Sequence, residues 1–183
     1  VLIDDCIKNG KDYNAGGARY NSSYIQGVGM GSITDCLSAV KYHVFEKKTT
    51  SMDELLTALD DNFENQNNLY FTLLNKTPKY GNDDDFADSI LRDVFELYFK
   101  AIDGRPNTRG GHYRINLLPT TSHVYFGSVT GATPDGRKAF VSLSEGISPF
   151  QGSDKHGPTA VLKSAAKIDH LRTGGTLLNQ KFT

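Results

Sequence analysis

Extended and helical segments alternate along this chain, and this alternation limits the possible fold more than any other feature. Residues 20–28 and 113–118 are predicted to be extended, and Pro119 ends the second of these segments. Apolar spacing and helix-start residues predict helices that begin near residues 32, 51, 69, 83 and 158. Strands that alternate with helices are typical of α/β proteins with partly parallel pairing. The predicted fold class is therefore α/β.

Two of the predicted helices begin with a serine cap that an acid follows three residues later, Ser32 with Asp35 and Ser51 with Glu54. The acids within residues 83–88 are expected to favour the positive end of the long helix that they open. Residues 142–157 show no clear period and are predicted to form an ordered loop. The helix that Ser32 opens is expected to bury one stripe, made of Ile33, Cys36, Leu37, Val40 and Val44.

Both ends of the chain lie within a structural pattern. Residues 1–7 have the spacing of the last two turns of an amphipathic helix that ends at Asn9 and Gly10. Residues 176–183 form an apolar, strand-like run. Chain ends are more often polar and frayed. We therefore expect the chain to be a section of a longer protein, and a processed complete protein is the alternative.

Charge and composition argue against several classes of protein. Lysine plus arginine total 20 and aspartate plus glutamate total 21, whereas nucleic-acid-binding proteins usually carry a basic excess. No apolar run approaches the roughly 20 residues of a membrane span, and residues 1–5 do not resemble a secretory signal. Two cysteines are too few for a disulfide framework. We expect a cytoplasmic protein that binds neither nucleic acid nor a membrane.

Glycines lie between the first extended segment and the helix after it, as in dinucleotide-binding folds. Gly27, Gly29 and Gly31 only partly match that motif, because Ser32 occupies the position of its third glycine. The acid expected about 20 residues further on is also missing, near Lys47. A tight turn before a capped helix is the better interpretation, and no cofactor is predicted to bind here.

The residues that usually bind metals are not spaced for a metal site. The five histidines never occur as His-x-x-x-His, and Cys6 and Cys36 are predicted to fill core volume. Residues 83–85 are three acids in a row, but they lack the glycine and the distal glutamate of a calcium loop. We therefore predict no metal site.

Three consecutive hydroxyl side chains follow the second extended segment. Thr120, Thr121 and Ser122 lie between Pro119 and a predicted short helix that Gly127 closes. Thr120 or Thr121 at the start of this helix would stand before free backbone N–H groups, which attract anions. A substrate carboxylate would suit this position. The alternative is a plain N-cap without a ligand.

Several longer strings resemble the glycyl radical enzymes, the pyruvate formate-lyase-like superfamily, and the resemblance covers nearly the whole chain. The turn Thr-Pro-Asp-Gly-Arg at 133–137 points to the superfamily alone. The run 118–127, together with 82–85 and 174–180, is most similar to the branch that dehydrates trans-4-hydroxy-L-proline. The strings that carry the resemblance are residues 16–21, 24–29, 76–85, 131–138, 144–149, 157–160 and 173–182.

The resemblance implies a section of a ten-stranded α/β barrel with outer helices, to which residues 1–183 would belong as one part. In this family a glycyl radical passes to a cysteine inside the barrel, and the thiyl radical removes a hydrogen atom from the substrate. A separate S-adenosylmethionine-dependent iron–sulfur activase installs the glycyl radical. The enzymes come from anaerobic bacteria, and a homodimer is expected for the parent enzyme.

The chain departs from the family pattern at both radical carriers. The radical cysteine of the family lies in a Gly-Cys-Val-Glu context, which neither Cys6 nor Cys36 has. The radical glycine lies in an Arg-Val-x-Gly-Tyr-like loop, and no such string occurs. Family order would place the cysteine loop before Val1 and the glycine loop after Thr183. We therefore expect no catalytic residue here, and a chain that is inactive without the remainder of its parent.

The resemblance implies a substrate-binding role for the hydroxyl segment. Thr120 matches the first threonine of the family segment that lines the pocket, while Thr121, Ser122 and Val124 are weaker candidates. The expected reaction is dehydration of trans-4-hydroxy-L-proline. Two alternatives stay open: a pyruvate formate-lyase-like formate C-acetyltransferase, and a non-catalytic scaffold or spare part for a damaged radical enzyme.

Overall fold

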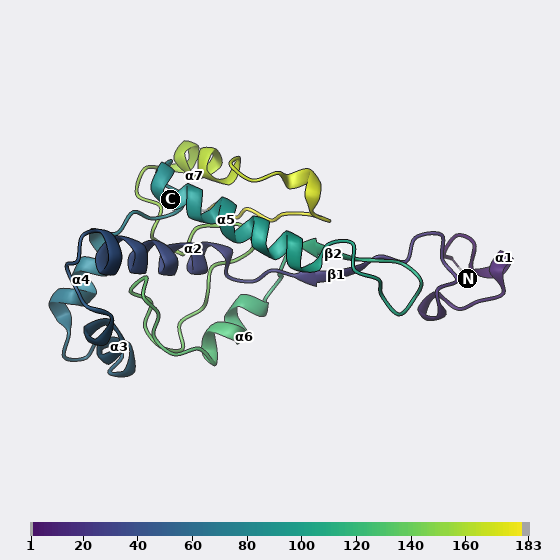
Figure 1. Ribbon diagram of the computed structural model, residues 1–183. Helices are drawn as coiled ribbons and strands as arrows, with labels where there is room; N and C mark the ends of the chain where they lie inside the picture. The colour runs from purple at the N-terminus through teal and green to yellow at the C-terminus, as the bar shows by residue number, and fades with distance from the viewer. Residues whose placement is uncertain (1, 181–183) are drawn as a thin grey trace.

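The computed structural model describes residues 2–180 and contains both helices and strands (Figure 1). The N-terminal residues lie at one end of the molecule, and α3 and α4 lie at the other (Figure 1). A π-helical segment, Val40–Glu46, continues α2. The elements are α1 (Cys6–Asn9), β1 (Ser23–Gln26), α2 (Met30–Ala39), α3 (Met52–Asp60), α4 (Asn67–Asn75), α5 (Asp85–Ile102), β2 (Tyr113–Asn116), α6 (Ser122–Ser128) and α7 (Pro158–Ala165).

The two strands pair in parallel, which confirms the predicted pairing. Ser23 lies opposite Tyr113 and Gln26 opposite Asn116. The chain near the C-terminus adds a short parallel bridge on the far side of β2, where Leu117 faces Thr176. The predicted extended run, residues 176–183, therefore lies beside the chain at the end of β2 where the run begins. Its last residues, 181–183, lie outside the described part of the chain.

The main core lies where α5 packs against α2 and the sheet. The face of α5 that carries Leu91 and Phe95 is buried against Ile115 and Leu117 from β2 and the residue that follows it. A second cluster forms where α3 and α4 meet the end of α2. Its buried members are Ala39, Leu55, Ala58, Phe63 and Leu73. Burial of such side chains stabilises each cluster by about 25 cal/mol per Å² of apolar surface.

Two of the helix starts are as predicted. Ser51 and Glu54 form a complete capping box at the start of α3. Asp84 caps α5 by accepting hydrogen bonds from the N–H groups of Phe86 and Ala87. These side chains satisfy N–H groups that have no partner inside the helix. The local sequence is therefore enough to start both helices.

The start of α2 differs from the prediction. Gly29 is the N-cap, with φ 79°, and Met30 is the first helical residue, so Ser32 lies inside the first turn. The Ser32 hydroxyl accepts a hydrogen bond from the N–H of Ser144 at 2.9 Å, and the Ser32 N–H donates to the Ser144 hydroxyl at 2.9 Å. A contact 112 residues away thus replaces the predicted local cap.

The predicted buried stripe of α2 is also wrong in part. Ile33 and Leu37 are each 42% exposed, while the buried side of the helix carries Asp35 and several small hydroxyl residues. Asp35 accepts a hydrogen bond from the backbone N–H of Tyr80 at 2.8 Å. The buried face of α2 therefore includes a polar contact with the chain at Tyr80, which the apolar spacing did not indicate.

The N-terminal helix is shorter than predicted. Only the four residues of α1 are helical, and Gly10 ends the turn with φ 59°. Leu2 is 96% and Ile7 75% exposed, and of the predicted apolar pattern only Cys6 is buried among the described residues. The predicted end at Gly10 is confirmed, because the left-handed region that ends a helix costs glycine little.

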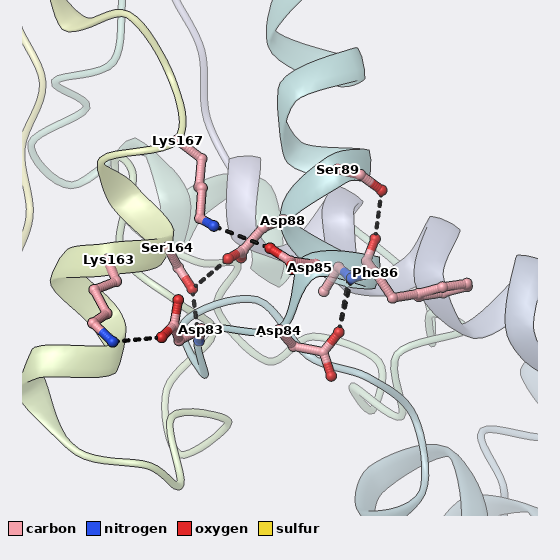
Figure 2. A network of polar contacts seen from close by, with 10 residues as sticks. Asp83, Asp84, Asp85, Phe86, Asp88, Ser89, Lys163, Ser164 and Lys167 are labelled. Atoms are coloured by element: carbon pink, nitrogen blue, oxygen red, sulfur yellow. Dashed lines mark hydrogen bonds and ion pairs between the residues drawn. The ribbon is translucent and has the colours of Figure 1, made fainter.

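The start of α5 is tied to α7 by a network of polar contacts (Figure 2). Lys163 pairs with Asp83 at 2.8 Å, and Lys167 pairs with Asp85 at 3.0 Å. Beneath these pairs the Ser164 hydroxyl donates to the buried Asp88 carboxyl at 3.0 Å. Burial raises the pKa of Asp88, and the Ser164 hydrogen bond opposes this. The acid run thus joins two helices as well as opening one.

We predict that Asp35 makes stability depend on pH. Burial raises the pKa of this carboxyl to about 7, against about 3.9 in an unfolded chain. Between these values the folded state holds a proton that the unfolded state releases, so the free energy of unfolding falls as pH rises and levels off above about 7. Chemical denaturation of the protein that contains this chain, at several pH values, measures the slope.

The variant Asp35→Asn isolates the effect, because the amide keeps the shape and cannot ionise. Asp88 contributes with the same sign, so the difference between wild type and variant is the quantity to compare. We expect a flatter pH profile in the variant. An identical slope in both proteins would show that Asp35 does not take up a proton on folding.

No helix in the described part of the chain has the length and apolar character needed to cross a membrane.

Candidate functional site

The candidate site lies where β1 and β2 end. Because the strands are parallel, their carboxyl ends meet at one edge of the sheet, where ligands commonly bind in α/β proteins. After β2 the chain continues through Leu117 and Leu118 to the buried Pro119. Thr120 and Thr121 follow and lead into α6. The hydroxyl segment is therefore presented at the sheet edge.

The predicted binding residues all lie at the start of α6. Thr120, Thr121 and Val124 are exposed in this chain, and Ser122 is half-buried. Thr121 holds the N-cap position, with φ -121°, and its side chain makes no cap hydrogen bond. The hydrogen bond that a plain N-cap predicts is therefore not formed at this helix start. Thr120 and Thr121 are therefore accessible at this edge of the sheet.

α6 is held in place from its other side. Gly127 is buried, and a Cβ atom there would lie 2.4 Å from the carbonyl oxygen of Val141. The N–H of Leu143 donates to the carbonyl oxygen of His123 at 3.1 Å. The small residue that sequence analysis identified as the end of the helix thus allows close contact with the following loop.

A hollow of about 670 Å³ opens beside α6, and sequence analysis did not find it. His123 and Val124 form one wall, and residues 141–154 form much of the remainder. The Nδ1 atom of His123 is buried and has no hydrogen-bond partner among the described residues. Glu145 accepts a hydrogen bond from the side-chain amide of Asn179 at this hollow. These groups come from distant segments, so no local pattern could reveal them.

The loop before the hollow is fixed by a buried arginine. Arg137 is 2% exposed and donates to the carbonyl oxygens of Val141 at 2.6 Å and Lys138 at 3.2 Å. Asp135 accepts hydrogen bonds from the Thr133 hydroxyl at 2.5 Å and the Arg137 N–H at 3.2 Å. The predicted turn at 133–136 is confirmed, and Arg137, the next residue, holds the following loop in place through these hydrogen bonds.

The glycines after β1 are explained by packing. A Cβ atom on Gly27 would lie 2.5 Å from Cδ2 of Leu117, and one on Gly31 would lie 2.7 Å from the carbonyl oxygen of Ser148. Gly29 caps α2 in the left-handed region. All three glycines are thus needed by the fold, which agrees with a tight turn before a helix.

The cysteines and histidines do not converge on one site. Cys6 and Cys36 are both buried free thiols. His43 lies between the hydroxyls of Thr49 and Thr77, at 2.9 and 3.0 Å. Within residues 2–180, no three histidine, cysteine, aspartate or glutamate side chains are grouped closely enough to hold a metal ion.

Two protein-family models match the chain. The model described as Pyruvate formate lyase-like matches residues 1–127, which is more than half of the sequence. The model described as Glycine radical matches residues 143–183. The hydroxyl segment lies within the first match, and most of the hollow lies within the second.

Similar proteins match along the whole sequence. The chain is 59% identical over 182 residues to a trans-4-hydroxy-L-proline dehydratase from Clostridioides difficile. It is 41% identical over 189 residues to a (2S)-3-sulfopropanediol dehydratase from Klebsiella oxytoca. Both matches cover 100% of this chain and 23% of the relative.

Solved structures agree with these matches. The crystal structure of hydroxyproline dehydratase from Clostridioides difficile, with trans-4-hydroxy-L-proline bound, matches with a TM-score of 0.95 and 59% identity. The glycerol-bound B12-independent glycerol dehydratase from Clostridium butyricum matches with a TM-score of 0.92 and 43% identity. Each match covers 98% of this chain and 23% of the solved chain. The chain therefore spans about a quarter of the length of these relatives.

Proposed function

Because the chain belongs to the pyruvate formate lyase-like family of glycyl radical enzymes, we propose that it is a section of a dehydratase for trans-4-hydroxy-L-proline. The observation that supports this best is the identity along the whole chain to a curated dehydratase for that substrate. The similarity to the substrate-bound structure supports it further. The α/β fold described above is a section of the glycyl radical enzyme barrel.

We propose that residues 1–183 form one part of that barrel and contain neither radical carrier. Residues 143–183, which match the Glycine radical model, contain five glycines. None of these stands in an Arg-Val-x-Gly-Tyr-like context, and neither cysteine stands in a Gly-Cys-Val-Glu context. The chemistry therefore requires parts of the parent protein other than these residues.

The role proposed for this chain is to hold the substrate. For trans-4-hydroxy-L-proline, the thiyl radical of the parent enzyme would remove a hydrogen atom from the ring carbon between the nitrogen and the carbon that bears the hydroxyl. The hydroxyl, together with one proton, would then leave as water, and the remaining radical would take a hydrogen atom back from the cysteine thiol. The Thr120 hydroxyl and the adjacent N–H groups would hold the substrate carboxylate by charge-assisted hydrogen bonds. Thr121, Ser122 and Val124 would complete this side of the pocket.

The proposed partners follow from the same chemistry. Glycyl radical enzymes need an activase, which we propose to be an S-adenosylmethionine-dependent iron–sulfur protein. The remainder of the parent chain would close the pocket. We further propose that the parent enzyme is a homodimer in the cytoplasm of an anaerobic bacterium, and that it binds neither nucleic acid nor a membrane. The net charge of -1 is consistent with a protein that does not bind nucleic acid.

Anaerobic turnover by the full-length enzyme tests the proposed function. After activation, we expect trans-4-hydroxy-L-proline to be converted into a product that has lost one water molecule, detected by mass spectrometry. Pyruvate with coenzyme A should give no acetyl-coenzyme A. An activated enzyme that forms acetyl-coenzyme A, or that leaves trans-4-hydroxy-L-proline unchanged, would contradict the proposal.

A further inference from the structure

β1 and β2 separate directly before the hydroxyl segment. The last ladder contact is the hydrogen bond from the Gly27 N–H to the Asn116 carbonyl oxygen, at 2.8 Å. Beyond it β1 turns away toward the N-cap of α2 at Gly29. The chain that follows β2 therefore continues past the point where its strand partner leaves.

The side chain of Gln26 takes the place of the missing strand. Its Oε1 atom accepts a hydrogen bond from the Leu118 N–H at 3.0 Å, and its Nε2 atom donates to the Leu118 carbonyl oxygen at 3.1 Å. A neutral glutamine carries both a donor and an acceptor, so one side chain satisfies both backbone groups of Leu118. These two residues are 92 positions apart in the sequence.

The neighbouring residue is held from the opposite side. The Leu117 N–H donates to the Gly175 carbonyl oxygen at 2.9 Å, and the Leu177 N–H donates to the Leu117 carbonyl oxygen at 3.0 Å. Leu117 and Leu118 are thus hydrogen-bonded on alternate sides, as in a strand with two neighbours. The Gln26 contact extends this strand-like hydrogen bonding by one residue, from Leu117 to Leu118, toward Thr120.

The position of Leu118 determines the position of Thr120. Only Pro119 lies between them, and its ring fixes φ and provides no N–H. Pro119 is also buried, so it is packed in place. Because a single buried residue with a fixed φ separates them, a displacement at Leu118 is expected to shift Thr120 as well.

We infer that Gln26 is a positioning residue, whose side-chain amide holds Leu118 so that Thr120 meets the substrate carboxylate. This inference rests on the proposed function of the hydroxyl segment. A contact that positions a carboxylate-binding group acts equally on bound substrate and on the transition state. Its loss should therefore raise KM and leave kcat nearly unchanged.

Two variants of the full-length enzyme test the inference. Gln26→Met keeps the length of the side chain and removes the amide, whereas Gln26→Asn keeps the amide and shortens its reach by one methylene. We expect KM for trans-4-hydroxy-L-proline to rise about threefold to tenfold in each, which corresponds to about 0.7–1.4 kcal/mol of lost substrate binding. Hydrogen exchange at the Leu118 amide should accelerate in both variants.

A matched control is Gln66→Met, at the N-cap position of α4, where the glutamine side chain makes no cap hydrogen bond. This variant should keep KM and the Leu118 exchange rate of the wild type. The glycyl radical content, measured by electron paramagnetic resonance, confirms that each variant folds and is activated. If Gln26→Met fails this check, Gln26→Asn supplies the comparison.

Faster exchange at Leu118 with an unchanged KM would overturn the inference, because the contact would then serve the fold alone. Unchanged exchange would overturn it as well. A failure of the proposed function is seen separately, since it appears in the unsubstituted enzyme as a normal radical signal without dehydration of trans-4-hydroxy-L-proline.

Discussion

The 183-residue chain alone, mixed anaerobically with activase and S-adenosylmethionine, should give no glycyl radical signal in electron paramagnetic resonance. The physical reason is that a stable glycyl radical needs its particular loop, and none of the 18 glycines stands in that sequence context. The expected result is a complete absence of the signal that the activated full-length enzyme gives. Spin quantification against a standard of known concentration measures it.

The full-length parent enzyme under the same conditions is the positive control, since it shows that the activase works. Selective deuteration of glycine in the chain alone would identify the origin of any signal. A doublet that changes on deuteration would contradict the proposal that the radical glycine lies outside this chain.

Thr120→Val in the full-length enzyme should lower kcat/KM for trans-4-hydroxy-L-proline by roughly ten- to 150-fold. The variant keeps the shape of the side chain and removes one hydrogen bond to a charged group, which is worth about 1.5–3 kcal/mol. Steady-state kinetics under anaerobic conditions measures the loss. The melting temperature should change little, because Thr121 holds the N-cap position of α6.

Thr57→Val is a suitable control, since Thr57 lies on the exposed side of α3 and its hydroxyl donates to the Asp53 carbonyl oxygen. This variant loses a threonine hydroxyl far along the chain from the site and should keep normal kinetics. A normal kcat/KM in Thr120→Val, with or without a lower melting temperature, would remove Thr120 from the proposed site.

Local signals in the sequence were enough for much of the fold. The capping box at Ser51, the acids at the start of α5 and the glycine end of α1 were all predicted, because neighbouring residues satisfy these backbone groups. The role of Asp84 as the N-cap of α5 was not predicted. The parallel pairing of β1 and β2 followed from the alternation of strands and helices. The caps and the helix end depend on residues only a few positions apart, whereas the pairing was inferred from the order of the elements.

Features that depend on distant contacts were not predictable in this way. Ser32 looked like a helix cap, but its hydroxyl is bound by Ser144 from the other part of the chain. Ile33 and Leu37 fit the predicted apolar stripe of α2 and are nevertheless each 42% exposed. The periodicity of a helix shows which residues share a face, and it cannot show where another element lies.

The candidate site divides in the same manner. Thr120 and Thr121 could be proposed from the sequence, because hydroxyl residues follow a strand end within a few positions. His123, Glu145 and Asn179 were missed, since only the folded loop brings them to one hollow. The Gln26 contact with Leu118 has no local signature at all, because the two residues meet only after the strands have paired.

The long interval between the two strands also has a consequence for synthesis on the ribosome. Gln26 and Leu118 are 92 residues apart, so at about 5–20 residues per second β1 waits on the order of 5–20 seconds before its partner is made. During that time its backbone N–H and C=O groups form an open edge that carries Tyr24 and Ile25. The helices made in the interval can fold within microseconds. The nascent chain is therefore expected to pass through a state with formed helices in which β1 has not yet paired with β2. Protection by a chaperone would matter most in that state.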